Sequence, residues 1–166
     1  MTVFIHDASI LLDLIHTDII KLFMTIPARM VTTDFVVEEV TDPADRKKLE
    51  ATISSDALQV MISGLAELDS IVTLQSACRA LSIADCSVLF YAGSLQAVVL
   101  TGDNRLRREA TQSGLEVHGT VWVFDELVTH VLLSQKEAAD KLENLLSVNP
   151  RLPREECERM INRWRK

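Results

Sequence analysis

Four acidic residues stand where a parallel sheet would gather them at one edge. Asp7 directly follows an apolar run that is typical of a buried strand, and Asp103 follows another. Glu39 lies in a short helical segment after a second such run, and Asp85 lies in the first turn of a helix that precedes the run before Asp103. Because ligands of open parallel sheets bind beyond the carboxyl ends of the strands, we expect these carboxylates to share one cleft.

Carboxylates that share a cleft repel one another, so some of them must take up protons unless a cation neutralises them. Mg²⁺ and Mn²⁺ prefer oxygen ligands and are usually held by one or two carboxylates, water and substrate phosphate oxygens. One ion can lower the pKa of a bound water, and two ions about 4 Å apart can clamp the attacking and leaving oxygens of a phosphoryl displacement. The chain offers no Cys/His ligand set, so the acids point to metal-assisted phosphodiester hydrolysis.

The elements that must position these acids follow from the apolar pattern. Five short runs are typical of strands and occupy residues 2–6, 30–33, 57–62, 97–101 and 115–118. Helical spacing or capping residues mark segments at residues 7–15, 18–24, 35–40, 65–81, 105–112 and 121–133. Asp34 is expected to cap the segment at 35–40, Pro43 to start a further helical turn, and Ser82 with Asp85 to form a capping box. Strands that alternate with helices predict a three-layer α/β/α sandwich with a central, mostly parallel sheet of about five strands.

The character of the chain changes past Ser134. Residues 135–146 and 153–164 are expected to form two further helices, separated by Asn149 and Pro150. We therefore predict one domain over residues 1–133 and a helical C-terminal extension over 134–166, packed on or beside the same domain. An apolar stripe on these two helices needs a covering surface, which can be the domain itself, a second copy or another protein; it comprises Leu142, Leu145, Leu146, Met160, Ile161 and Trp164.

Four motifs in series resemble those of PIN domains. Residues 5–11 resemble the opening D-x-S/T-x-L signature, and residues 36–40 resemble the second acidic motif. Residues 80–85 resemble the G-L-x-x-x-D stretch, with Ala80 in place of its glycine, and residues 99–106 resemble the strand-end T-x-D-x-x-L motif. The similarity covers approximately residues 1–133, in order and with ordinary spacing, so the four motifs together are fairly specific.

This resemblance implies a metal-dependent nuclease, most often a ribonuclease, and commonly the toxin half of a prokaryotic toxin–antitoxin pair. Four carboxylates would then ligate or orient Mg²⁺ or Mn²⁺: Asp7, Glu39, Asp85 and Asp103. Three polar residues would hydrogen-bond these carboxylates or a water on the metal: Ser9, Thr101 and Asn104. Arg105 stands where the family often has a fifth acid, so one ion could bind tightly and a second only with substrate.

Each acid also has an ordinary structural interpretation. Asp7 can cap a helix, Asp103 belongs to a Gly-Asp-Asn turn, and Asp85 can simply favour a helix N-terminus. Glu38 competes with its neighbour Glu39 for the second acidic position, and Glu39 is preferred because the family's Glu directly precedes an apolar residue, here Val40. The joint pattern favours the metal site because it explains all four positions at once.

Basic residues are candidates for binding phosphate groups, and three of them follow the last acid of the pattern: Arg105, Arg107 and Arg108. The C-terminal segment, starting with Arg151, is also rich in basic residues that could contact phosphate groups; they are partly offset by nearby glutamates and can equally form a solvated helix face.

The composition sets outer limits on these hypotheses. The 166 residues include 17 Lys or Arg and 24 Asp or Glu, giving a net charge of −7, so nonspecific affinity for RNA should be weak. Hydrophobic residues make up 48% of the chain, which excludes disorder. Three cysteines without metal-ligand spacing, and the lack of a signal peptide or membrane span, predict a cytoplasmic protein.

The leading hypothesis is a Mg²⁺- or Mn²⁺-dependent endoribonuclease whose partners are RNA, a small antitoxin protein and a second copy of itself, with no membrane. A catalytically degenerate PIN-like protein that binds nucleic acid or acts as a scaffold is the alternative. An aspartyl-phosphate enzyme built around Asp7 is a weaker idea, because it expects a second Asp where this chain has Ser9.

Overall fold

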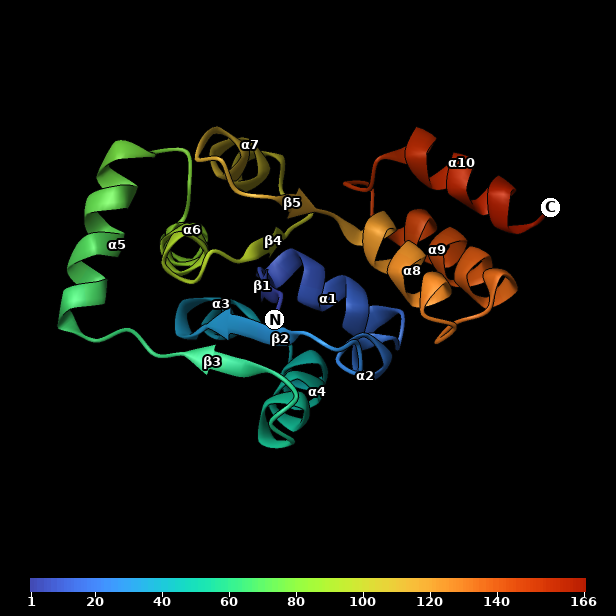
Figure 1. Cartoon of the computed structure of the whole chain (residues 1–166), viewed down its shortest axis with the longest axis horizontal. Coiled ribbons are helices and arrows are strands. Elements are labelled where there is room, and N and C mark those ends of the chain that lie inside the picture. The colour runs from blue at the N-terminus through green and yellow to red at the C-terminus, as the bar shows by residue number, and fades with distance from the viewer.

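Five parallel strands form the centre of the computed structural model, which describes residues 1–166 (Figure 1). The strands are β1 (Val3–His6), β2 (Arg29–Thr33), β3 (Gln59–Met61), β4 (Val98–Leu100) and β5 (Val117–His118). Their order in the sheet is β3-β2-β1-β4-β5, and every neighbouring pair is parallel. Each strand falls within one of the runs expected from the sequence or differs from it by one residue. The expected parallel sheet is therefore confirmed.

Ten helices connect and follow the strands. They are α1 (Ala8–His16), α2 (Ile20–Phe23), α3 (Asp34–Glu39), α4 (Pro43–Ser54), α5 (Leu65–Ala77), α6 (Ile83–Leu95), α7 (Asn104–Gln112), α8 (Thr120–Thr129), α9 (Gln135–Val148) and α10 (Arg154–Trp164). Helix α6 packs on β1, β2 and β4 and touches α3, α5 and α7, whereas α1 packs with α2, α4 and α8. Central strand residues such as Ile5, Val31 and Val99 are fully buried, as expected of a parallel sheet covered on both faces.

Two local predictions around α3 and α4 need correction. Thr33, not Asp34, caps α3, because its hydroxyl accepts a hydrogen bond from the backbone N–H of Val36 at 3.1 Å. Asp34 instead accepts hydrogen bonds from the backbone N–H and the hydroxyl of Ser63 at 2.8 and 3.1 Å, which fastens the end of β3. The segment after Pro43 is a twelve-residue helix rather than a single turn, and Asp42 caps it.

The helical spacing of apolar residues from Leu65 predicts an amphipathic helix with one buried face, but α5 buries little of that face. Of the face expected to be apolar and buried, only Ile71 is fully buried, while the side chain of Leu65 is 88% exposed. Leu68 and Val72 are exposed as well. The reason is positional, since α5 stands at one end of the molecule and packs chiefly on α6 (Figure 1).

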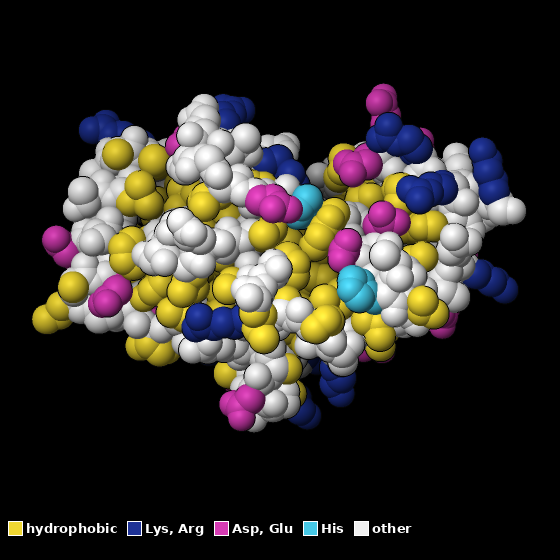
Figure 2. Space-filling view, viewed as in Figure 1, with side chains coloured by type: hydrophobic (Ala, Val, Ile, Leu, Met, Phe, Trp, Pro, Cys, Tyr) yellow, Lys and Arg dark blue, Asp and Glu magenta, His cyan; other side chains and the backbone are white.

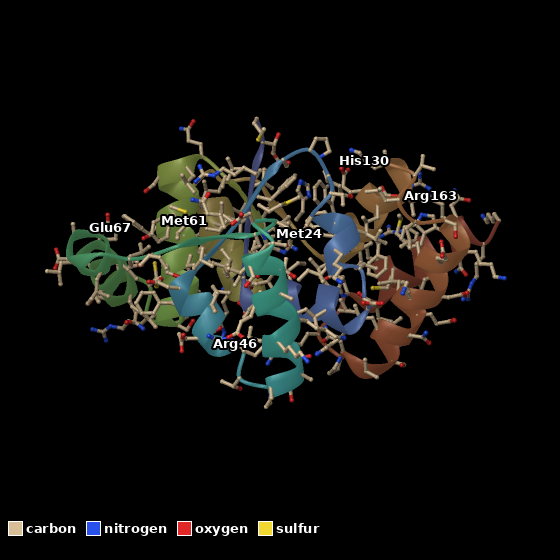
Figure 3. The ribbon with its side chains drawn as sticks, turned by 90° about the horizontal axis from the view of Figure 1, so that it is seen from below. Met24, Arg46, Met61, Glu67, His130 and Arg163 are labelled. Carbon is tan, nitrogen blue, oxygen red and sulfur yellow. The ribbon has the colours of Figure 1, made fainter.

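The C-terminal helices lie at the other end of the molecule. Helices α9 and α10 pack on each other and on α8, and four residues of their apolar stripe are buried: Leu142, Leu145, Ile161 and Trp164. The chain's own helices therefore cover most of this stripe. Figure 3 shows the separation of the two ends, with Glu67 of α5 on one side and Arg163 of α10 on the other. None of the ten helices has the length and apolar character needed to cross a membrane.

Candidate metal centre

The carboxyl ends of β1 and β4 bring Asp7 and Thr101 together. These strands are neighbours, and the backbone N–H of Asp7 donates to the carbonyl of Leu100 at 3.2 Å. Asp7 caps α1, and its Oδ1 accepts hydrogen bonds from the Ser9 hydroxyl at 2.7 Å and from the backbone N–H of Ile10 at 3.0 Å. Its Oδ2 accepts a hydrogen bond from the Thr101 hydroxyl. Both oxygens of this buried carboxylate are thus held in place.

Asp103 and Asp85 also lie at helix N-termini. Asp103 caps α7, with Oδ1 accepting from the backbone N–H groups of Arg105 and Leu106 at 2.9 and 3.0 Å. Asp85 forms the expected capping box with Ser82 at the start of α6, where its Oδ2 accepts from the backbone N–H of Ser82 at 3.1 Å. The interpretation of Asp85 as a residue that favours a helix N-terminus is therefore correct, whereas Asp103 caps a helix rather than belonging to a turn. Neither role excludes metal binding. Oδ1 of Asp85 and Oδ2 of Asp103 receive no hydrogen bond from the protein.

The two adjacent glutamates of α3 have different surroundings. Glu38 is largely exposed and forms an ion pair with Arg46 of α4 at 3.5 Å. Glu39, the last residue of α3, lines the same cavity as Asp85. The structure thus places Glu39, rather than Glu38, with the other acids.

All four candidate acids line one cavity of about 420 Å³. Helices α1, α6 and α7 begin at this cavity with their capping carboxylates, and the partial positive charge of each helix N-terminus favours anions there. The remaining lining residues are Ala8, Ser9, Leu12, Val36, Ser82 and Arg151. The expected cleft at the carboxyl edge of the sheet is therefore present.

Burial and mutual repulsion raise the pKa values of three of these acids. Burial raises the pKa of Asp7 to about 6, and the nearby charge of Asp85 adds to the rise. Burial also raises the pKa of Asp85, with a further contribution from Asp103 and an opposing one from Arg105. The pKa of Glu39 is raised by burial and then by the charge of Asp85. A cation in the cavity would lower these pKa values, because it stabilises the charged forms.

The acids share a cavity without forming a tight cluster. No three Asp, Glu, His or Cys side chains lie close enough together to form a ready-made ion site. Asp7, Asp85 and Asp103 each direct an oxygen at the backbone of their own helix, which keeps the carboxyl groups apart. An ion in this cavity would therefore have to contact one or two of these carboxylates directly and reach the others through water, as Mg²⁺ does in many proteins.

The other candidate residues divide between this cavity and a second one. Ser9 and Thr101 hydrogen-bond Asp7, as the resemblance implied. Asn104 and Arg107 line an adjoining cavity instead, and Arg105 is near enough to lower the pKa of Asp85. Arg108 is exposed, forms no side-chain hydrogen bond or ion pair, and lines neither cavity.

The sequence indicated the basic C-terminal segment with Arg151 as a candidate for contacting phosphates, but it did not indicate that Arg151 lies beside the acids, and it gave no role to Asp13. Arg151, between α9 and α10, lines both cavities although it lies far along the chain from every motif. Asp13 of α1 is buried and accepts hydrogen bonds from Thr120 at 2.6 Å and from Asn149 at 2.9 Å. The position of Asp13 among the apolar residues of α1 could have indicated a buried carboxylate. It could not have identified Thr120 and Asn149 as its partners, because both lie more than one hundred residues away.

An α/β/α sandwich with four acids at the carboxyl edge of a parallel sheet defines the class of protein. The family model described as PIN domain matches residues 3–166, and the chain belongs to the PIN domain family.

Two solved structures have a similar fold. PAE2754 from Pyrobaculum aerophilum superposes with a TM-score of 0.56 at 14% identity, covering 77% of this chain and 90% of that one. VapBC-1 from nontypeable Haemophilus influenzae superposes with a TM-score of 0.51 at 13% identity, covering 72% of this chain and 98% of that one. No curated protein sequence matches the chain.

Proposed function

We propose that the chain is a Mg²⁺- or Mn²⁺-dependent endoribonuclease. PIN domains are generally nucleases, and the observation that carries the proposal for this chain is the convergence of Asp7, Glu39, Asp85 and Asp103 on one cavity. Burial first, and then the charge of a neighbouring carboxylate, raise the pKa values of Asp7, Glu39 and Asp85, and this cost of holding negative charge in the cavity supports cation binding.

The carboxylate oxygens that receive no hydrogen bond from the protein indicate which residues would contact the ion. Asp85 and Asp103 each keep an oxygen without a protein donor, so these two residues and Glu39 would contact the ion most directly. Asp7 has both oxygens held by Ser9, Ile10 and Thr101 and would orient the site through its charge and water. The ion, when bound, would supply a Lewis acid for a phosphoryl oxygen and a more acidic water.

Hydrolysis would add the elements of water across one phosphorus–oxygen bond of the RNA backbone. One product would end in a phosphate and the other in a hydroxyl group, with the proton balance closed by water. Arg105, close to Asp85, would offset part of the negative charge that the phosphate brings. The helix N-termini at the cavity would favour the approaching anion in the same way.

We also propose that the chain acts as a toxin with a small antitoxin partner. PIN domains are commonly the toxin half of such pairs, the Gly119-Thr120 step after the last strand resembles a PIN subgroup often encoded beside small antitoxins, and the fold is similar to that of VapBC-1. The reading frames next to the gene test this: a small frame whose product binds the chain and suppresses RNA cleavage on co-expression is expected, and the lack of any such frame, or a product that neither binds nor inhibits, would contradict it.

The direct test of the proposed activity uses a mixed pool of single-stranded RNA. Cleavage is expected in Mg²⁺ or Mn²⁺, none in EDTA, and recovery when metal is restored. Asp103→Asn is the matched variant, because Asn still caps a helix well while removing one metal-binding oxygen. Equal cleavage by this variant and the parent in excess metal would overturn the proposal.

A non-catalytic, nucleic-acid-binding PIN-like protein is the second candidate. The absence of a tight acid cluster and the basic residue Arg105 in place of a fifth acid favour it. The same RNA experiment separates the two candidates, since a scaffold would bind RNA without cleaving it at any metal concentration.

A further inference from the structure

A second cavity of about 490 Å³ adjoins the acidic one and shares Ser9 and Arg151 with it. Its walls come from the start of α7, from the turn between β5 and α8, and from the segment between α9 and α10. Figure 2 shows the surface notched between the α7 side and the C-terminal helices, with basic side chains at the edge of the notch.

Arg107 is a fixed cation in this second cavity. Its Nη2 donates a hydrogen bond to the carbonyl of Thr101 at 3.3 Å, at the end of the acid-bearing segment after β4. Gly119 makes room for the guanidinium, because a Cβ at this position would lie 2.8 Å from Nη2. A guanidinium has five N–H donors, so the remaining ones are available to a phosphate group.

An aromatic pair lines the same cavity. The rings of His118 and Trp122 stack with their centroids 4.2 Å apart and an interplanar angle of 10°. Both side chains are partly exposed, and Trp122 is braced from behind by an edge contact with Phe4 at 5.5 Å. Such a braced ring pair offers a surface on which an unpaired base can stack.

Arg151 is held at the boundary between the two cavities by a chain of hydrogen bonds. Its backbone N–H donates to Oδ1 of Asn149 at 3.0 Å, and Nδ2 of Asn149 donates to Asp13 at 2.9 Å. Thr120 donates to the other oxygen of Asp13 at 2.6 Å. Asp13 therefore anchors the segment that carries Arg151. Both carboxylate oxygens of Asp13 already accept hydrogen bonds, so Glu156 is the acid of this cavity that remains able to accept one from a ligand.

We propose that this second cavity binds one nucleotide of single-stranded RNA beside the bond that is cleaved. The base stacks against His118 and Trp122, Arg107 contacts its phosphate, and Arg151 contacts the phosphate shared with the acidic cavity. This inference rests on the proposed ribonuclease function, because that function identifies the bound strand as RNA. A carboxylate such as Glu156 can accept a hydrogen bond from an exocyclic amino group, which gives the cavity a means of base preference.

Binding can be measured apart from cleavage with an eight-nucleotide 2′-O-methyl RNA of mixed sequence in EDTA. We expect Arg151→Ala to raise the Kd about five- to tenfold at low salt and to reduce the slope of log K against log salt by about 0.7, the value for one phosphate contact to a single strand. Arg163→Ala is the control, because Arg163 is an exposed cation near the end of α10 that lines neither cavity. Unchanged affinity in a folded Arg151→Ala variant, or equal loss in the control, would overturn the proposal.

Tryptophan fluorescence gives an independent readout of the base. Trp122 and Trp164 are the chain's two tryptophans, and Trp164 is buried in α10. The oligonucleotide should quench the emission of the parent, and Trp122→Phe should abolish the quenching; quenching that persists in this variant would contradict stacking at Trp122.

These results separate the two proposals. Binding that depends on Arg151 and Trp122, without cleavage in any metal, would refute the nuclease and keep the nucleotide site. Metal-dependent cleavage with binding indifferent to both residues would refute the site and keep the nuclease.

Discussion

Replacing Asp7 with Asn separates the charge of this carboxylate from its structural role. Asn is a favoured N-cap residue, so the hydrogen bond from Ile10 at the start of α1 can be kept. The substitution removes a negative charge that burial makes costly, since Asp7 is 4% exposed and its pKa is raised to about 6. We therefore expect Asp7→Asn to abolish RNA cleavage while making the metal-free protein more stable.

The size of this gain follows from the pKa of Asp7. A rise from 3.8 to about 6 corresponds to about 3 kcal/mol of unfolding free energy at neutral pH. Asn loses part of this gain, because its amide nitrogen cannot accept the Thr101 hydroxyl hydrogen that Oδ2 accepts, at a cost of about 1–2 kcal/mol. The net gain is about 1–2 kcal/mol, or roughly 2–8 °C in Tm for a chain of this length.

The gain depends on pH in a defined direction. The pKa of Asp7 is raised in the folded protein, so its contribution to stability is fully present below about pH 4 and is lost as the pH rises through about 6. The stability difference between variant and parent should therefore grow between about pH 4 and 6.5 and level off above. Below pH 4 the variant should lose its advantage.

Urea unfolding in EDTA at several pH values, followed by unfolding in Mn²⁺, measures these effects. At a hundredfold excess over Kd, Mn²⁺ should stabilise the parent by about 2.7 kcal/mol and the variant by much less. A variant that is less stable than the parent in EDTA at pH 7.5, or that gains as much from Mn²⁺, would refute the reasoning.

Three further substitutions test neighbouring parts of the structure. Glu39→Gln should abolish RNA cleavage, whereas Glu38→Gln should leave the rate unchanged, because the exposed Glu38 pairs with Arg46 outside the cavity. Equal rates for both variants would contradict the placement of Glu39. Ser82→Ala and Ser134→Ala each break a capping box and should each lower the unfolding free energy by about 1 kcal/mol. Only Ser82→Ala should slow RNA cleavage; an equal effect of both variants on cleavage would mean that Ser82 acts through stability alone. Asn149→Ala should cost about 1–3 kcal/mol in urea unfolding, since it leaves an oxygen of a buried carboxylate without its donor, and unchanged stability would show that this hydrogen bond does not hold the C-terminal segment.

The sheet and the acid cavity could be predicted because their signals are local. Each strand is a short apolar run, and Asp7 and Asp103 follow their strands within a few residues. A parallel sheet then determines that such residues meet at one edge. The capping box of Ser82 and Asp85 is a four-residue pattern, and the structure confirms it.

The remaining features depend on contacts between distant parts of the chain. Arg151 lines the acid cavity because Asn149 binds Asp13, a contact that spans 136 residues and follows no periodic pattern. The exposure of Leu65 likewise depends on the position of α5 at the end of the molecule, which its own sequence does not specify. Residues close together in the sequence are enough to predict the helices and strands. Which polar side chains meet depends on how these helices and strands pack.

The most direct test of the metal-dependent ribonuclease is the rate of RNA cleavage against the fraction of protein with bound Mn²⁺, measured for the parent and Asp103→Asn. The account predicts no cleavage at zero occupancy, a rate that rises with occupancy in the parent, and weak binding with no cleavage in the variant. Cleavage that continues in metal-free parent protein, or a variant that binds Mn²⁺ and cleaves RNA as the parent does, would contradict it.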